Sequence, residues 1–104
     1  MGKSFTGYSR TSISGAAASQ MLILDAPGTG FHNRIYKIVL TSNATVDLLL
    51  SNDLGTYYTV AGSTVVLDYG ELGTVGTVGN TALGVTSSGA ANVGTDILYC
   101  VEAD

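Results

Sequence analysis

Residues 33–52 read NRIYKIVLTSNATVDLLLSN, and this stretch decides the fold class. Apolar and polar residues alternate in two segments, a pattern that is typical of half-buried β-strands. One face of the two segments carries Tyr36, Ile38, Leu40, Val46, Leu48 and Leu50. The opposite face carries Ile35, Lys37, Val39, Thr41, Asp47, Leu49 and Ser51. We expect a hairpin with a polar turn at residues 42–44, because a one-residue slip would turn the apolar set out to water.

The rest of the chain repeats this pattern of short strands separated by turns. Fourteen Gly and one Pro fit many turns, and no segment has a convincing helical period. An all-β fold is therefore predicted, an antiparallel β-sandwich of jelly-roll or Greek-key type. The further strands are expected at residues 20–26, 56–60, 63–69, 81–87 and 95–103, with a glycine-spaced loop at 70–80 and a turn at 88–94.

The apolar faces of the predicted strands define an expected core. Its members are Ile38, Leu40, Val46, Leu48, Leu50, Val65, Leu67, Leu83, Val85, Ile97, Tyr99 and Val101. In the last strand Leu98 and Cys100 face the other way, so this strand has apolar residues on both faces. Such a strand is either covered on both sides or part of a subunit contact. The same two explanations apply to Leu49, which is apolar on the face that carries Asp47 and Ser51.

Residues 1–19, MGKSFTGYSRTSISGAAAS, are predicted to form an extended N-terminal arm, and residues 20–104 the β-sandwich domain. The arm carries three apolar and two basic residues that are candidate partner contacts: Lys3, Phe5, Tyr8, Arg10 and Ile13. Ordering costs about 1–2 kcal/mol per residue, so we expect the arm to become ordered only against a partner. Deletion of residues 2–13 would then leave the sandwich folded.

Charged residues make up 12% of the chain and hydrophobic residues 45%, which suggests a solid core and a surface partly covered by other subunits. We therefore expect a homo-oligomer, either a trimer or a dimer. All four basic residues lie in the first 37 positions, whereas seven of the eight acids lie in residues 38–104. Four basic residues are too few for a nucleic-acid groove. Either a basic arm reaches an acidic neighbour, or a few charges are segregated by chance.

No reaction chemistry is indicated, and we expect neither an enzyme nor a bound metal or cofactor. Gly28-Thr29-Gly30 lacks the Lys and the helix of a phosphate loop. One His and one Cys make a poor zinc set, so His32 is expected to be a loop residue with local hydrogen bonds. Glu71 and Glu102 are the only Glu residues, and the chain has no Trp on which a sugar can stack. Cys100 is expected to be a buried thiol.

Neither a secretory signal nor a membrane helix is predicted. The chain opens without a basic and then apolar leader, and no stretch approaches the ~20 apolar residues that span a bilayer. Asn43-Ala44-Thr45 matches a glycosylation sequon, but without a signal peptide we expect a hairpin turn there. The prediction is a soluble protein that is made in the cytoplasm and does not bind membranes.

Two stretches resemble the small β-sandwich decoration (cement) proteins of tailed bacteriophages. They are residues 34–52 and the run GNTALGVTSSGAANV at 79–93, which is followed by ILYCVE at 97–102. The resemblance implies a virion protein on the outer capsid surface, bound as homodimers or homotrimers to the major capsid protein and bracing the shell. It also implies that the arm, residues 1–19, helps to engage the capsid or a neighbouring subunit, which would make the five candidate residues named above capsid or subunit contacts. No catalytic residues come with the family.

A second function stays open, that of a carbohydrate- or receptor-binding module of a phage fibre or tail. Its site would comprise Tyr57, Tyr58 and residues 70–80, and the absence of Trp counts against it. Another virion component, such as a head–tail or minor tail protein, is a third alternative.

Overall fold

The computed structural model describes residues 3–15, 20–76 and 79–104, the first range by its backbone only. No helix occurs among these residues. Alternating apolar residues favour the extended state, because it places successive side chains on opposite faces. The strands are β1 (Lys3–Gly15), β2 (Gln20–Leu24), β3 (Phe31–Ser42), β4 (Val46–Leu50), β5 (Gly55–Thr59), β6 (Thr64–Asp68), β7 (Thr74–Val75), β8 (Leu83–Ser87) and β9 (Ala91–Ala103).

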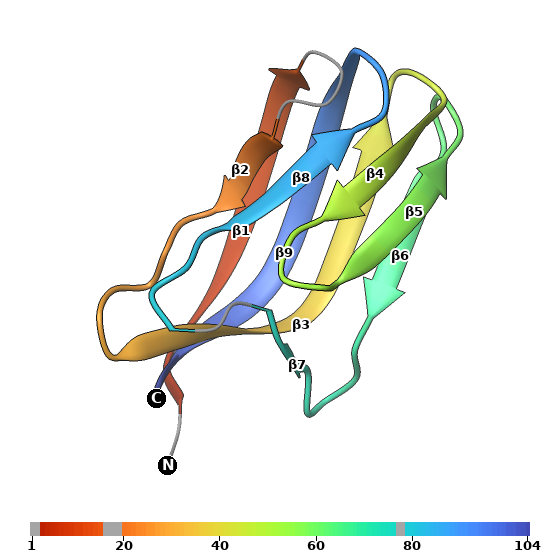
Figure 1. The fold of residues 1–104 in the computed structure, drawn as a ribbon. Coiled ribbons are helices and arrows are strands. Elements are labelled where there is room, and N and C mark those ends of the chain that lie inside the picture. The colour runs from red at the N-terminus through yellow and green to blue at the C-terminus, as the bar shows by residue number, and fades with distance from the viewer. Residues whose placement is uncertain (1–2, 16–19, 77–78) are drawn as a thin grey trace.

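The strands build two antiparallel sheets that pack face to face (Figure 1). Sheet A has the order β1-β9-β3-β6, with the short β7 also paired to β3, and sheet B has the order β2-β8-β4-β5. Four of the strand pairs are nested in the sequence: β1 with β9, β2 with β8, β3 with β6 and β4 with β5. A long hairpin wrapped into two sheets in this way is a jelly roll, so the predicted fold class is confirmed.

The hairpin predicted for residues 33–52 is wrong, although both of its strands exist. β3 pairs within sheet A, whereas β4 pairs with β5 and β8 in sheet B. Residues 43–45 are therefore a corner between the sheets and not a hairpin turn. The Asn43 amide donates to the Asn92 carbonyl at 3.2 Å, and the Asn92 amide donates to the Asn43 Oδ1 atom at 2.8 Å. Each strand has one apolar face, and stacking the two faces across a core buries both.

A β-bulge at Tyr36 changes the predicted faces of β3. The register against β9 shifts between Ile35 and Lys37, which reverses the alternation before this point. Ile35 is therefore fully buried in the core cluster, contrary to the prediction. Tyr36, predicted on the Ile38 face, lies outside that cluster with its hydroxyl 3.3 Å from the Cys100 Sγ atom. The prediction assumed regular alternation along the whole strand, and it therefore assigned Ile35 and Tyr36 to the wrong faces.

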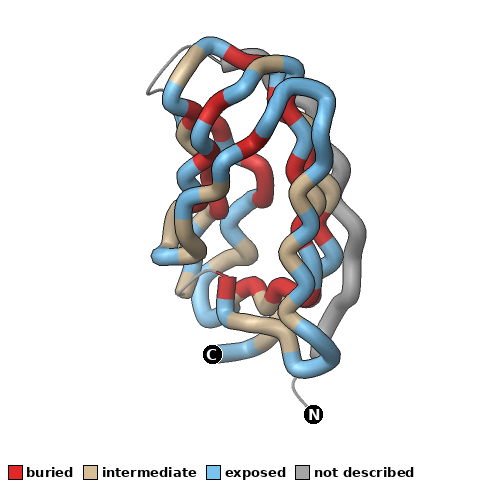
Figure 2. Tube along the Cα trace, turned by 90° about the vertical axis from the view of Figure 1, so that its right-hand side faces the viewer, coloured by how far each residue is buried: buried red, intermediate tan, exposed pale blue. Residues whose placement is uncertain are grey.

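Buried and exposed residues alternate along the strands (Figure 2), and most of the buried apolar residues form one core cluster. The confirmed members of the predicted core are Ile38, Leu40, Val46, Leu48, Leu50, Leu83, Val85 and Ile97. The remaining members are only half-buried: Val65, Leu67, Tyr99 and Val101. Val65 and Leu67 belong to β6, which ends the order of sheet A among the described strands, and Val101 lies near the end of β9. Positions at the border of a sheet have fewer neighbours to cover them.

Part of the glycine-spaced loop predicted at residues 70–80 is the strand β7, and residues 73–76 pack closely on β3. A Cβ atom on Gly76 would lie 2.2 Å from the Ile35 Cδ1 atom, and one on Gly73 would lie 2.7 Å from the Ile35 carbonyl oxygen. Gly73 also has a φ of +63°. Glycine is required for this approach, so these two residues determine how β7 covers the bulge of β3.

β9 begins at Ala91, inside the turn predicted at residues 88–94. It is longer than predicted because it pairs along its length with β1 on one side and with β3 on the other. The backbone hydrogen bonds of two long neighbours extend a strand through small residues such as Gly94, which have a low β-propensity of their own.

β1 takes residues 3–15 of the predicted arm into sheet A. It runs along β9 from Lys3 opposite Glu102 to Gly15 opposite Ala91, and it ends the sheet order in the described part of the chain. The division into an arm of residues 1–19 and a domain of residues 20–104 stays a prediction, as does the ordering of the arm by a partner. Residues 1–2 and 16–19 and the side chains of the predicted contact residues lie outside the described structure.

Candidate functional site

Sheet A holds all four basic residues of the chain, two in β1 and two in β3. Opposite charges at facing positions of an antiparallel pair stabilise the pair. The register sets three of the basic residues directly opposite an acid, in the pairs Lys3–Glu102, Arg10–Asp96 and Lys37–Asp68. Basic residues from the first part of the chain and acids from the later part therefore occupy facing positions within one sheet. This arrangement differs from both sequence-based alternatives, which were a basic arm that reaches an acidic neighbour and a chance segregation of charges.

A charged cluster lies where β3 begins and β9 ends (Figure 1). The His32 Nε2 atom lies 2.9 Å from Glu102 Oε1, and its Nδ1 atom lies 2.9 Å from Asp104 Oδ1. The Arg34 Nε atom donates to the same Glu102 oxygen at 2.8 Å, and its Nη1 atom donates to the Leu72 carbonyl at 3.0 Å. The prediction for His32 was therefore wrong: it is a strand residue held by two carboxylates that are distant in the sequence.

Each group of this cluster stabilises the charged form of its neighbour. The hydrogen bond with Asp104, followed by that with Glu102, raises the pKa of His32 above its ordinary value of 6.5, although burial acts in the opposite direction. The hydrogen bond from Arg34, followed by that from His32, lowers the pKa of Glu102 below 4.5, again against burial. Both imidazole nitrogens face a carboxylate oxygen, so only the protonated ring can donate to both. The cluster is suited to fastening the end of β9 to β3.

The outer face of sheet B carries far less charge. Asp47 is the single charged residue in the described strands of this sheet. Leu22 is 57% exposed, Leu49 49% and Tyr58 67%. Leu22 alternates with buried neighbours, Leu49 lies opposite Thr86, and Tyr58 lies opposite Asp47, so all three share the outer face. We call this surface the sheet B face. Exposed large apolar side chains with little charge between them are typical of a contact surface.

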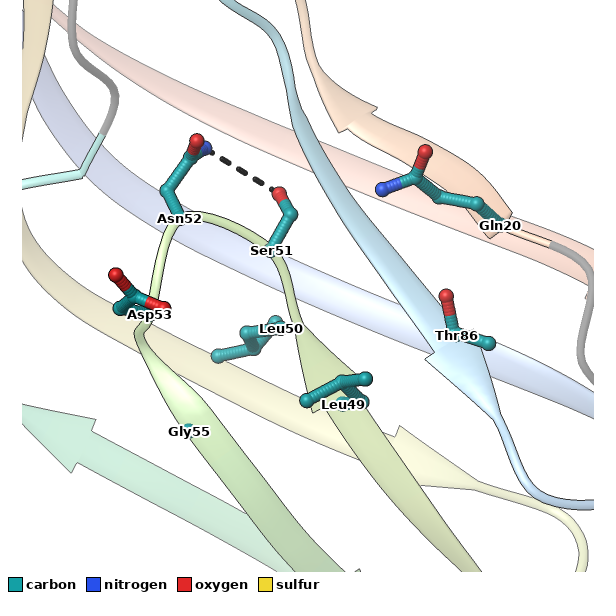
Figure 3. A pocket seen from close by; sticks show the side chains of 8 residues that line it. All are labelled: Gln20, Leu49, Leu50, Ser51, Asn52, Asp53, Gly55 and Thr86. Atoms are coloured by element: carbon teal, nitrogen blue, oxygen red, sulfur yellow. Dashed lines mark hydrogen bonds between the residues drawn. The ribbon is translucent and has the colours of Figure 1, made fainter.

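An open pocket of about 490 Å³ lies on the sheet B face beside the turn between β4 and β5 (Figure 3). Asn52 and Asp53 in this turn have positive φ angles of 58° and 61°, which both residue types tolerate and hairpin turns use. The Ser51 Oγ atom accepts from the Gly84 amide at 2.8 Å and from Asn52 Nδ2 at 3.3 Å, which fastens the turn to β8. The pocket is lined by Gln20, Leu49, Leu50, Ser51, Asn52, Asp53, Gly55 and Thr86.

The structure brings the predicted contact residues to one strand, β1, at the border of sheet A. The predicted sugar site is not assembled. Tyr58 stands on the sheet B face, whereas Thr74 and Val75 of the predicted loop pair with β3 in sheet A. Tyr57 packs against the core, and its hydroxyl donates to the Leu54 carbonyl.

Sequence reasoning identified only part of the sheet B face. Leu49 stood out because it is apolar on the polar side of its strand. Leu22 was missed because its strand reads QMLIL, which is apolar at nearly every position and gives no sign of direction. The pocket was missed as well, and the Asn52-Asp53 turn was the one signal of its place.

No family model, no curated protein and no solved structure matches this chain. Cys100 is buried, as predicted. Among the described residues, no three His, Cys, Asp or Glu side chains are grouped so that they can hold a metal ion. The described residues also contain no helix that is long and apolar enough to cross a membrane.

Proposed function

We propose that this protein is a structural virion protein that decorates the outer surface of a bacteriophage capsid as a homo-oligomer and stabilises the shell. In this proposal the sheet B face contacts the major capsid protein. The sequence resemblance suggests the role, and one structural observation supports the surface. Leu22, Leu49 and Tyr58 are exposed together on a sheet whose described strands hold one charged residue.

The energetics of this face suit binding in many copies. Full burial of a large apolar side chain is worth roughly 1.5–3 kcal/mol, and about half of that remains to be gained where the side chain is half exposed. Association itself costs about 4–15 kcal/mol, so a single copy would bind weakly. A homo-oligomer on a repeating lattice engages several such contacts at once and gains by avidity.

Sheet A is the less suitable docking surface. Val66 is 53% exposed and Leu98 38%, but the register surrounds them with charged positions. Lys37 and Asp68 face each other across β3 and β6, next to Val66. Covering such pairs would remove charges from water, a cost that the sheet B face largely avoids.

The proposal is tested by adding the purified protein to capsids that lack it, prepared from the phage that encodes it, and measuring the bound copies by sedimentation. We expect the wild type to bind and Leu49→Asp to bind at least about tenfold more weakly, since a charge would be buried in the contact. Val66→Asp is the matched control on sheet A and should bind as the wild type does. Absence of wild-type binding contradicts the proposed role, and equal weakening by both variants contradicts the proposed face.

The pocket favours a second candidate, a carbohydrate-binding module. Its lining offers an amide, hydroxyl and carboxylate groups beside the apolar Leu49, which are the groups that recognise a sugar ring. In this case a glycan array would show binding that Asp53→Ala abolishes and that the sheet A variant Asp68→Ala leaves unchanged. Capsid binding without any glycan binding decides against this candidate.

A further inference from the structure

We propose that β1 joins two copies of this chain by antiparallel pairing of their β1 strands, so that the two A sheets form one continuous sheet. This inference rests on the homo-oligomer of the proposed function and names its interface, but it requires no capsid. It can therefore be tested on the protein alone, and its failure is distinguishable from failure of capsid binding.

The position of β1 is the first observation that supports the pairing. β1 is 13 residues long and ends the order of sheet A in the described part of the chain. An edge strand presents backbone donors and acceptors with which a second strand can pair. Natural edges are often protected by proline, bulges or charge. β1 contains no proline, and its register shift lies at one end, between Lys3 and Phe5.

The charges of β1 do not protect this edge either. Lys3 and Arg10 lie opposite Glu102 and Asp96 of β9 in the register. A cation that faces an acid of its own sheet repels an incoming strand less than an unpaired cation does, because the net charge of the cation and the acid together is zero. Over residues 5–15 the strand therefore combines length, regularity and balanced charge.

The second observation is that the sequence of β1, KSFTGYSRTSISG, is complementary to itself when it is reversed about Ser9. A two-fold axis at Ser9 sets Phe5 opposite Ile13 of the second copy and Tyr8 opposite Arg10, and each pair occurs twice. Apolar cross-strand pairs and an aromatic ring beside a cation both stabilise a sheet.

Neighbouring registers lack this complementarity. An axis at Arg10 would place the two Arg10 residues opposite each other, and like charges at facing positions destabilise a pair. An axis at Tyr8 would set Ile13 opposite Lys3 and Phe5 opposite Thr11, so both apolar pairs are lost. The sequence of β1 thus favours one register, and with it a dimer of two-fold symmetry.

Disulfide trapping tests the register. Thr6→Cys and Ser12→Cys are made separately in a Cys100→Ser background, because Thr6 lies opposite Cys100 in β9. In the proposed dimer Thr6 of one copy faces Ser12 of the other, with Cα atoms about 4.5–5.5 Å apart, which a disulfide can bridge. Two Ser12 residues would be roughly 20 Å apart. We expect a mixture of the two proteins to form a covalent dimer under mild oxidation and each protein alone to stay uncrosslinked.

A charge exchange provides the second test, read by sedimentation equilibrium of the protein without capsid. The wild type should be a dimer at micromolar concentration. Thr6→Lys with Ser12→Lys should weaken the dimer at least about tenfold, because it places like charges opposite each other twice. Thr6→Lys with Ser12→Glu carries the same first change and should restore the dimer. A cooperative thermal transition of each double variant shows that both are folded.

Three outcomes overturn the inference. One is a wild type that remains a monomer at high micromolar concentration, as expected if another protein pairs with this edge. Another is a trimer, which strand pairing about a two-fold axis cannot produce. The last is crosslinking of Ser12→Cys with itself as efficiently as with Thr6→Cys, which would show a different interface.

Discussion

The two outer faces of this sandwich use charge in opposite ways. On sheet A every basic residue of the chain lies in β1 or β3, and acids of β6 and β9 stand beside them. On sheet B the described strands carry Asp47 alone, and Leu22, Leu49 and Tyr58 are exposed. The comparison suggests that charge in this protein holds the strands of one sheet together and leaves the other sheet free to make contacts.

The largest expected effect is a difference in stability between substitutions on the inner and the outer side of sheet B. Leu48 is fully buried, so Leu48→Ala should lower the free energy of unfolding by about 2–5 kcal/mol through lost burial and a cavity. Leu49→Ala, one residue along on the sheet B face, should change it by no more than about 0.5 kcal/mol. Urea denaturation measures both. A large loss with Leu49→Ala would show that the chain itself uses this side chain.

The next largest effect is the loss of stability when a carboxylate on sheet A is neutralised, compared with the same change on sheet B. Glu102→Gln removes the negative charge of the acceptor shared by Arg34 and His32, and should cost about 1–2 kcal/mol because the three groups are only partly exposed. Asp47→Asn makes the same chemical change on sheet B and should cost less than about 0.5 kcal/mol. Denaturation at neutral pH measures the difference. Equal losses would contradict a special role of charge in sheet A.

The contribution of His32 should depend on pH. Because its folded-state pKa is raised, the protonated ring stabilises the fold fully below its ordinary pKa of 6.5, and this contribution is lost as the pH rises through the raised pKa. Glu102 behaves in the opposite sense: its contribution is present above 4.5 and is lost as the pH falls through its lowered pKa. The stability difference between wild type and His32→Gln should therefore shrink from mildly acidic to alkaline pH. The difference for Leu49→Ala should stay constant, and a His32 effect that does not change with pH would contradict the cluster.

The smallest effect concerns the exposed residues of sheet B. Leu22→Ser and Tyr58→Ser should each change the free energy of unfolding by no more than about 0.5 kcal/mol, since water already reaches both side chains. Both variants should nevertheless bind capsids less well. Thermal melting together with the sedimentation assay measures the two quantities side by side. If a variant lowers stability and capsid binding together, the loss of binding can be explained by unfolding, and this result would contradict a direct role of the sheet B face in binding.

How far the sequence could predict this structure is shown by its central stretch. Residues 46–50 alternate as VDLLL, and Val46, Leu48 and Leu50 are buried while Asp47 and Leu49 are exposed, as expected. The partner of that strand could not be predicted. A hairpin turn and a corner between sheets both need a few small polar residues, and the Asn43–Asn92 hydrogen bonds that hold the corner join positions 49 residues apart.

The candidate surfaces were predictable to a smaller extent. Apolar residues on the polar side of a strand pointed to Leu49, but nothing in QMLIL could show that Leu22 faces outward. The cluster of His32, Arg34 and Glu102 depends on the pairing of β3 with β9. Pairing between strands that are distant in the sequence leaves no local pattern, so the sequence suggested a loop histidine with local hydrogen bonds.

The sequence by itself determined the all-β class, the strands other than β1 and β7, and the inward faces of those that alternate regularly, because these follow from a two-residue period that each such strand carries locally. Only the tertiary structure decided which sheet each strand joins, where β3 bulges at Tyr36, and which acid stands beside each basic residue. Those choices are made by long-range backbone pairing and by the fit of two apolar faces across one core. Alternation within a strand is a local property, and it is the same for a strand in either sheet.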